Sequence, residues 1–261
     1  MKREEGDKIS SINIRDGMLY FLLIPIVLLF CIEAIIRIKR VPAYLVPLPS
    51  VILRELVKSR NIFLAHSFVT VKEILLGFLF GVIAGTILAI SMFYFKPLKK
   101  IALPFILFSK AFPKLALAPL FLIWFGFGML PKLAMSALMS FFPVMVNLLS
   151  GLQNVPKERI ELFKSLCAKR THIFFKLLLP SSLPYIFVGL KTALVYATSG
   201  VIIGEFISSN SGLGYLIFVS SHQFRTDVSF AAVVILAAVV ILFYSILNFL
   251  ERKILNWREV G

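Results

Sequence analysis

The stretch Ser67–Phe95 reads SFVTVKEILLGFLFGVIAGTILAISMFYF and contains no charged residue after Glu73. An apolar helix needs about 20 residues to cross the hydrocarbon core of a bilayer, so this stretch is long enough to span it. Gly77, Gly81 and Gly85 recur at every fourth position and leave a flat groove on one helix face. We expect another helix of the same chain to pack closely into this groove.

The rest of the 261 residues has the same apolar character. Hydrophobic residues make up 59% of the chain and charged residues 16%, whereas soluble domains hold roughly 45–50% and about 25%. Long continuous runs argue against a transmembrane barrel, whose strands are short and alternate in polarity. The sequence therefore predicts an all-α polytopic membrane protein with about six transmembrane helices. They are expected near residues 18–36, 67–95, 101–125, 131–149, 183–207 and 230–250.

The third of these apolar blocks is irregular, because it contains three prolines and two lysines, namely Pro104, Pro113, Pro119, Lys110 and Lys114. Broken helix is tolerated at membrane depth only where protein covers it or where it lines a water-filled cavity. We therefore expect Lys110 and Lys114 to line a path that attracts an anion. The alternative is that both lysines snorkel toward an interface or sit at a break in the helix.

The chain carries 28 basic and 13 acidic residues, a net charge of +15. This excess would suggest nucleic-acid binding in a soluble protein, but here the basic residues gather in short loops, as they do on the cytoplasmic side of membrane proteins. The pattern predicts a cytoplasmic segment at 1–17, a transmembrane domain at 18–250 with a cytoplasmic loop at 151–180, and a cytoplasmic tail at 251–261. Lys132 is placed with the outer loops, and residues 37–60 are unusually basic for an outer segment.

Residues 161–180 of the cytoplasmic loop read ELFKSLCAKRTHIFFKLLLP. Leu162, Phe163 and Leu166 form an apolar face at helical spacing, with charged residues beside it. Such a helix suits a groove on another protein or the surface of lipid headgroups, and composition leaves both readings open. Pro180 is expected to end this helix, because proline lacks the amide donor.

This segment resembles the EAA loop of ATP-binding-cassette importer permeases. The family pattern is Glu-Ala-Ala, three residues, Gly, nine residues, an aliphatic residue, any residue and then Leu-Pro. Glu161 takes the place of the Glu, Cys167 replaces the Gly, and Leu179 and Pro180 match Leu-Pro. The resemblance implies that the segment couples to an ATPase through Glu161, Leu162, Phe163, Ser165, Cys167, Ala168, Leu179 and Pro180.

The resemblance extends over residues 46–257 and is closest to the nitrate, sulfonate and taurine branch of these permeases. Its further motifs are Pro47-Leu48-Pro49-Ser50, Ala118-Pro119-Leu120, Trp124-Phe125-Gly126-Phe127-Gly128, Gly204-Glu205-Phe206 and Ser211-Gly212-Leu213-Gly214. It implies a type I importer permease fold in the cell membrane. It also implies a translocation path for a small solute, anionic or heterocyclic.

The same resemblance implies partners. It predicts cytoplasmic ATP-binding subunits, an extracytoplasmic substrate-binding protein and a second permease subunit, expected as a homodimer, all acting within membrane lipid. The chain contains no Gly-x-x-x-x-Gly-Lys-Ser/Thr motif. We therefore expect a transport subunit that is not an enzyme and binds no cofactor, with ATP used by the partner.

Two polar residues within predicted spans remain open. Glu205 is either a residue of the path or gate, or an interfacial or ion-paired group, and the sequence favours neither. A pair with Lys191 inside one helix is excluded, because 14 residues separate them by about 21 Å along a helix. Asn147 is a second candidate for the path, although packing between helices is the simpler role.

Other classes of function find less support. A stand-alone secondary transporter or channel would need coupling-ion carboxylates, for which only Glu33, Glu73 and Glu205 are candidates, and usually an internal repeat. A membrane enzyme would need a converging catalytic group. The three histidines lie apart in the sequence, so no metal site is predicted.

Overall fold

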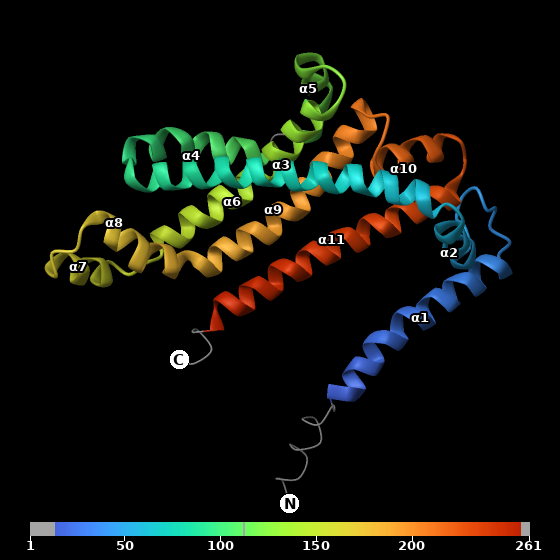
Figure 1. The fold of residues 1–261 in the computed structure, drawn as a ribbon, viewed down its shortest axis with the longest axis horizontal. Coiled ribbons are helices and arrows are strands. Elements are labelled where there is room, and N and C mark those ends of the chain that lie inside the picture. Colours follow the sequence, from blue (N-terminus) through green and yellow to red (C-terminus); the bar gives the residue numbers. More distant parts are fainter. Residues whose placement is uncertain (1–13, 112, 257–261) are drawn as a thin grey trace, which may run out of the picture.

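The computed structural model describes residues 14–111 and 113–256, and every regular element in these ranges is a helix (Figure 1). The predicted all-α class is confirmed. The helices are α1 (Ile14–Ile38), α2 (Pro49–Lys58), α3 (Arg60–Tyr94), α4 (Lys96–Ala111), α5 (Ala118–Phe125), α6 (Met129–Gln153), α7 (Lys157–Ser165), α8 (Arg170–Ile173), α9 (Leu179–Ser208), α10 (Leu213–His222) and α11 (Thr226–Ile254). A 3-10 turn, η1 (Lys114–Leu117), precedes α5, and a π-helical turn, η2 (Phe174–Leu178), joins α8 to α9.

Four helical segments of the described residues are long and apolar enough to cross a membrane: 60–94, 129–153, 170–208 and 226–254. They correspond to the spans predicted at 67–95, 131–149, 183–207 and 230–250, and each is longer than predicted. The helix α3 starts at Arg60, before the predicted Ser67, because buried Phe63 packs against Leu213 and Val228 of α10 and α11. Tertiary contacts thus extend the helix into a polar stretch.

The third apolar block is broken, as its prolines predict. Pro104 lies inside α4, Pro113 stands immediately before η1, and Pro119 occupies the first turn of α5. Proline supplies no amide donor and fixes its own φ, so it is tolerated at a helix start but interrupts a continuous helix. Residues 101–125 therefore form two helices and a turn in place of one span.

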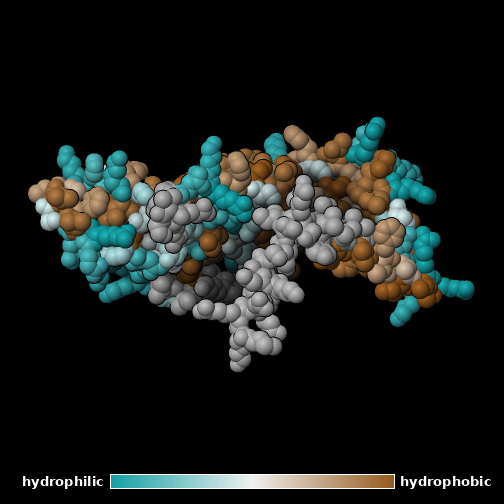
Figure 2. Space-filling model, turned by 90° about the horizontal axis from the view of Figure 1, so that it is seen from below, coloured by the Kyte–Doolittle hydropathy of each residue, from teal (hydrophilic) through white to brown (hydrophobic). Residues whose placement is uncertain are grey.

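The two ends of the long helices carry different short elements (Figure 1). We call residues 154–170, which hold α7, the α7 end. We call residues 39–59 and 223–226, which hold α2 and the turn between α10 and α11, the α2 end. Figure 2 shows hydrophilic residues at both ends of the molecule, with some others between them. Polar ends around apolar helices are the arrangement expected of a membrane protein.

The centre of the fold is α6, which packs against α3 on one side and α9 on the other. A Cβ atom added to Gly77 would lie 2.3 Å from Cβ of Ser136, and one added to Gly81 would lie 2.0 Å from Oγ of Ser140. On the other side, a Cβ at Gly200 would lie 2.7 Å from Cα of Ser136. The prediction that the glycine groove serves packing within the chain is confirmed.

Replacing Gly81 with leucine should separate α3 from α6, because the new side chain would also meet the backbone oxygen of Ala137, 2.8 Å from its Cβ. Overpacking of this kind lowers the free energy of unfolding by about 1–3 kcal/mol. Ala84→Leu is the matched control, since Ala84 lies exposed on the same helix. Thermal unfolding in detergent measures both variants, and equal midpoints would contradict the proposed packing.

Candidate functional site

The helix α7 is anchored by one face and leaves the other face exposed. Ile160 and Phe163 pack on a core cluster that includes Leu152 of α6 and Ile173 of α8. Leu162 and Leu166 point outward and are 58% and 72% exposed. The single apolar face expected from the sequence is therefore divided: Phe163 faces the core, whereas the two leucines face outward.

The turn after α7 explains why the family pattern has glycine at position 167. The amide of Ala168 donates to the carbonyl of Phe163 (3.0 Å) and the amide of Cys167 donates to the carbonyl of Lys164 (2.9 Å). This bond pair defines a Schellman turn, whose C′ residue adopts the left-handed conformation. Cys167 has φ +54°, so it adopts this conformation at a cost of about 1–2 kcal/mol relative to glycine.

The prediction that Pro180 ends the helix of this loop is wrong. Helical structure continues from Arg170 to Ser208, and Pro180 lies in the first turn of α9. The π-helical turn η2 immediately precedes it. A wider turn of this kind changes the backbone register just where proline cannot donate, so the chain passes Pro180 without a break. Residues 170–180 are thus helically continuous with α9, whereas the turn at 166–169 separates them from α7.

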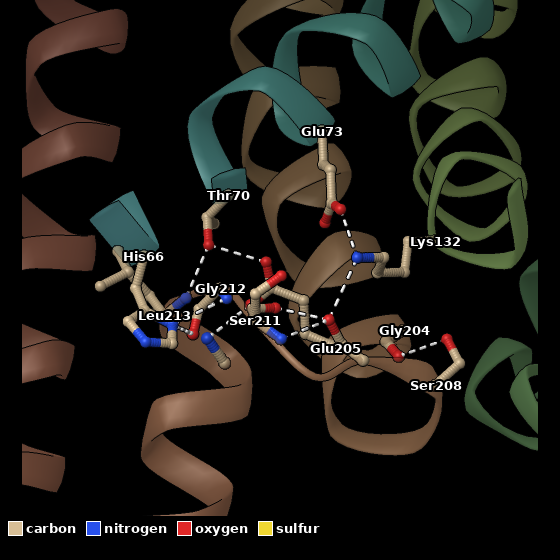
Figure 3. A network of polar contacts seen from close by, with 12 residues as sticks. His66, Thr70, Glu73, Lys132, Gly204, Glu205, Ser208, Ser211, Gly212 and Leu213 are labelled. Carbon is tan, nitrogen blue, oxygen red and sulfur yellow. Dashed lines mark hydrogen bonds and ion pairs between the residues drawn. The ribbon is translucent and has the colours of Figure 1, made fainter. Parts of the chain in front are cut away.

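A second group of polar residues lies between α3, α6 and α9 (Figure 3). Lys132 forms an ion pair with Glu73, and Glu205 lies in the same network; these three side chains are 4%, 3% and 1% exposed. The Lys132 ammonium also donates to Oγ of Ser209 over 3.1 Å. Burial of an ion pair is costly unless it is compensated by close geometry and further hydrogen bonds. We call Glu73, Lys132, Glu205 and Thr70 the polar cluster.

The polar cluster fastens the loop between α9 and α10 onto α3. The Thr70 hydroxyl donates to Oε1 of Glu205 (2.7 Å) and accepts the amide of Leu213 (2.7 Å). The amide of Gly214 donates to Oε2 of Glu205, so both carboxylate oxygens have partners. Gly212 has φ +111°, and a Cβ there would lie 2.1 Å from Oε1 of Glu205. Only glycine fits this position.

The sequence predicted the environment of these residues only in part. Lys132 was expected in an outer loop, but it is buried in α6, because the carboxylate of Glu73 compensates its charge. Of the readings left open for Glu205, exposure at the interface is wrong. The ring of His66 accepts the amide of Gly212 (2.9 Å), which links two motifs 146 residues apart. No local sequence pattern indicates a contact between residues so far apart in the chain.

The remaining candidate path residues do not come together. Lys114 lies over the ring of Phe142 (4.7 Å to the centroid) and near Tyr196 (5.7 Å). Asn147 donates to the carbonyl of Pro143 in its own helix over 2.8 Å. Lys110 lies in α4, and its side chain is outside the described part of the chain.

Lys191 lies on α9, as Glu205 does, but its ion-pair partner lies on another helix. Its ammonium forms an ion pair with Glu251 and donates to Oδ1 of Asn248 over 2.9 Å. Both partners lie on α11. The prediction that Lys191 does not pair with Glu205 is confirmed, and the contact instead joins α9 to the last helix.

Residues 77–256 match the family described as binding-protein-dependent transport system inner membrane component. The chain belongs to this family. It is therefore a multi-pass protein of the inner membrane and a permease subunit of an ATP-binding-cassette importer, as the sequence resemblance predicts. The subunits of this family are transport components and not enzymes themselves.

Two relatives of this chain are named as permeases for different solutes. The formylaminopyrimidine transport permease protein ThiX of Halalkalibacterium halodurans is 33% identical over 83% of this chain and 87% of its own length. The permease of Bacillus subtilis described as an aliphatic sulfonates transport protein, SsuC, is 33% identical over 94% of this chain and 90% of its own. Equal identity to permeases for different solutes means that identity alone does not choose a solute for this family member.

A solved structure shows the same architecture. The methionine transporter MetNI, in an inward-facing crystal form, aligns with a TM-score of 0.67 at 16% identity, covering 76% of this chain and 98% of that one. This likeness confirms the importer permease fold.

Removal of the ammonium of Lys132 should destabilise the permease strongly, since it leaves Glu73 buried without its counter-ion. Lys132→Met should lower the free energy of unfolding by about 3–5 kcal/mol. The double variant Lys132→Met/Glu73→Gln should recover much of this loss, because no uncompensated charge remains. Thermal unfolding in detergent gives the comparison, with exposed Lys58→Met as control. A double variant no more stable than Lys132→Met would contradict the ion-pair account.

Proposed function

We propose that this permease forms the translocation path for a small anionic or heterocyclic solute and is driven by a separate ATPase that binds α7. The observation that carries the coupling proposal is the pair of exposed leucines, Leu162 on α7 and Leu166 at its C-terminal cap, while the opposite face of α7 packs on the core. A short helix with apolar anchors and flanking charges, here Glu161 and Lys164, fits a groove on a partner protein.

The packing around α7 offers a route for the coupling. Leu152 and Val155 connect α7 to α6, while Ile173, Leu177 and Leu178 connect it to the beginning of α9. A push on α7 would therefore move α6 and α9 together, as rigid elements that share one core. Because the same two helices carry Lys132 and Glu205, movement at the α7 end would reach the polar cluster.

The proposed assembly contains two copies of this chain, two ATP-binding subunits and an extracytoplasmic binding protein. The family description supplies the binding protein, and the absence of a phosphate-binding Gly-x-x-x-x-Gly-Lys-Ser/Thr motif in this chain supports a separate ATPase. In this arrangement α7 faces the cytoplasm and the α2 end faces the opposite side of the membrane.

Among the four residues expected along the path, Lys114 has surroundings that support the role. Its ammonium, at the break between α4 and α5, has ring contacts from two helices and no ion pair within the described residues. Tyr196 is 43% exposed on α9. A cation beside aromatic faces suits a solute with an anionic group and a flat or apolar body.

Charge reversal at Glu161 tests the coupling. Glu161→Arg should reduce the yield of ATPase copurified with the permease by roughly tenfold, since it places a cation within the proposed contact; a change of this size corresponds to about 1.4 kcal/mol. Membrane insertion of the variant should be unchanged, because Glu161 is exposed. Arg252→Glu on α11 is the control for reversed charge, and copurification of the Glu161 variant at the wild-type yield would refute the proposal.

The charge of Lys114 can be tested without knowing the solute. With Cys31 and Cys167 replaced by serine, a Tyr196→Cys thiol would lie close to the Lys114 ammonium. It should react faster with an anionic methanethiosulfonate than with a cationic one, because a nearby cation attracts the anionic reagent. Lys114→Gln should remove that preference. A preference that is the same in both backgrounds would exclude Lys114 as an anion-attracting group.

A further inference from the structure

The α2 end bears positive charge that is not compensated within the chain. Arg37 pairs with Glu33, and Arg225 pairs with Glu55. Five other basic residues in or next to this end are exposed and form no ion pair with any described residue; they are Lys39, Arg40, Arg54, Lys58 and Arg60. We call these five residues the basic rim. Figure 2 shows hydrophilic residues along the margin of the molecule that holds α2.

A pocket of about 420 Å³ opens beside the basic rim, between the loop after α1 and the turn between α10 and α11. Arg40 and an aromatic pair line it: the rings of Tyr44 and Phe224 meet edge to face at 6.3 Å, and these side chains are 54% and 71% exposed. The hydroxyl of Thr226 donates to the carbonyl of Ala43 (2.7 Å) and ties the two walls together. Aromatic residues and arginine around a pocket are the composition of interface hot spots.

Two residues of this pocket hold costly backbone conformations. Arg40 has φ +50° and Phe224 has φ +55°, the left-handed region that favours glycine. Residues kept in such conformations cluster at functional sites, where the side chain has a use that outweighs the strain. Both side chains line the pocket, so the strained turns present a charge and a ring to its opening.

Lipid headgroups do not account well for this surface. Headgroup charge needs no pocket, whereas this surface combines basic residues, which are depleted from outer loops, with an aromatic pocket. A basic rim on the outer side, with an aromatic pocket in its midst, fits an acidic protein surface better. Electrostatic complementarity of this kind speeds encounter and fixes orientation, while the pocket supplies short-range affinity.

We propose that the basic rim and the Tyr44–Phe224 pocket form the docking surface for an acidic face of the extracytoplasmic binding protein, one of whose side chains enters the pocket beside Arg40. This inference rests on the proposed function, which places α7 in the cytoplasm and the α2 end outside.

The test measures the Kd of the fluorescently labelled binding protein of the same transport system for the permease–ATPase complex in phosphatidylcholine nanodiscs. Arg54→Glu/Lys58→Glu should raise Kd roughly tenfold, since two attractive contacts become repulsive. It should also weaken the dependence of Kd on salt. Lys96→Glu/Lys100→Glu changes the net charge equally at the start of α4 and should leave Kd unchanged. A Kd equal to wild type in the Arg54/Lys58 variant overturns the proposal.

Glycine variants separate docking from folding. Arg40→Gly and Phe224→Gly suit the left-handed backbone, so the thermal midpoint should not fall, yet each should raise Kd because the side chain is gone. Unchanged Kd values in both variants would overturn the proposed role of the pocket in docking. If phosphatidylglycerol nanodiscs stabilise wild type more than the Arg54/Lys58 variant while Kd is unaffected, the rim binds lipid and the proposal fails. ATPase copurification, governed by Glu161 at the other end, reports separately on the proposed function.

Discussion

The ammonium of Lys132 is buried between three long helices, and this burial constrains the rest of the fold. A buried charge is tolerated only with a partner and further hydrogen bonds. Glu73 from α3 and Ser209 after α9 supply them, so α6 is fixed against both neighbours. Gly81 and Gly204 make this approach possible, since a Cβ at Gly204 would lie 2.8 Å from Cγ of Lys132. Small residues and buried charge are thus two requirements of one contact.

The three packed helices connect the two ends of the molecule. At the α7 end, the Schellman turn and η2 lead from α7 into α9, and one core cluster packs against all three elements. Toward the other end, Glu205 on α9 holds the loop that leads to α10, and α10 packs on α11 beside the α2 end. The chain therefore has a continuous path of packed and hydrogen-bonded elements between its two polar ends. Such elements transmit motion by changing between discrete arrangements, since packed cores deform little.

The apolar runs predicted the helices well, because length and hydropathy decide which segments can cross a bilayer. The family pattern also predicted that position 167 suits glycine, and Cys167 has the left-handed backbone that glycine favours. The polar cluster was not predictable. Lys132 at the start of a span looks like a loop residue until Glu73, 59 residues away, is placed beside it. The prediction that the helix ends at Pro180 failed for a local reason. A π-helical turn before a proline lets the helix continue, and no pattern in the amino-acid composition indicates such a turn.

Three helix ends of the described chain share one construction. Besides the turn at Cys167, the amide of Val41 donates to the carbonyl of Ile36 after α1, and the amide of Arg225 donates to that of Ser220 after α10. Each is a Schellman turn, and each has a residue other than glycine in the left-handed position: Arg40, Cys167 or Phe224. Glycine would relieve about 1–2 kcal/mol of strain at each. All three residues lie at the polar ends, where the proposed partners bind, so strain is concentrated where side chains and turn geometry face another protein.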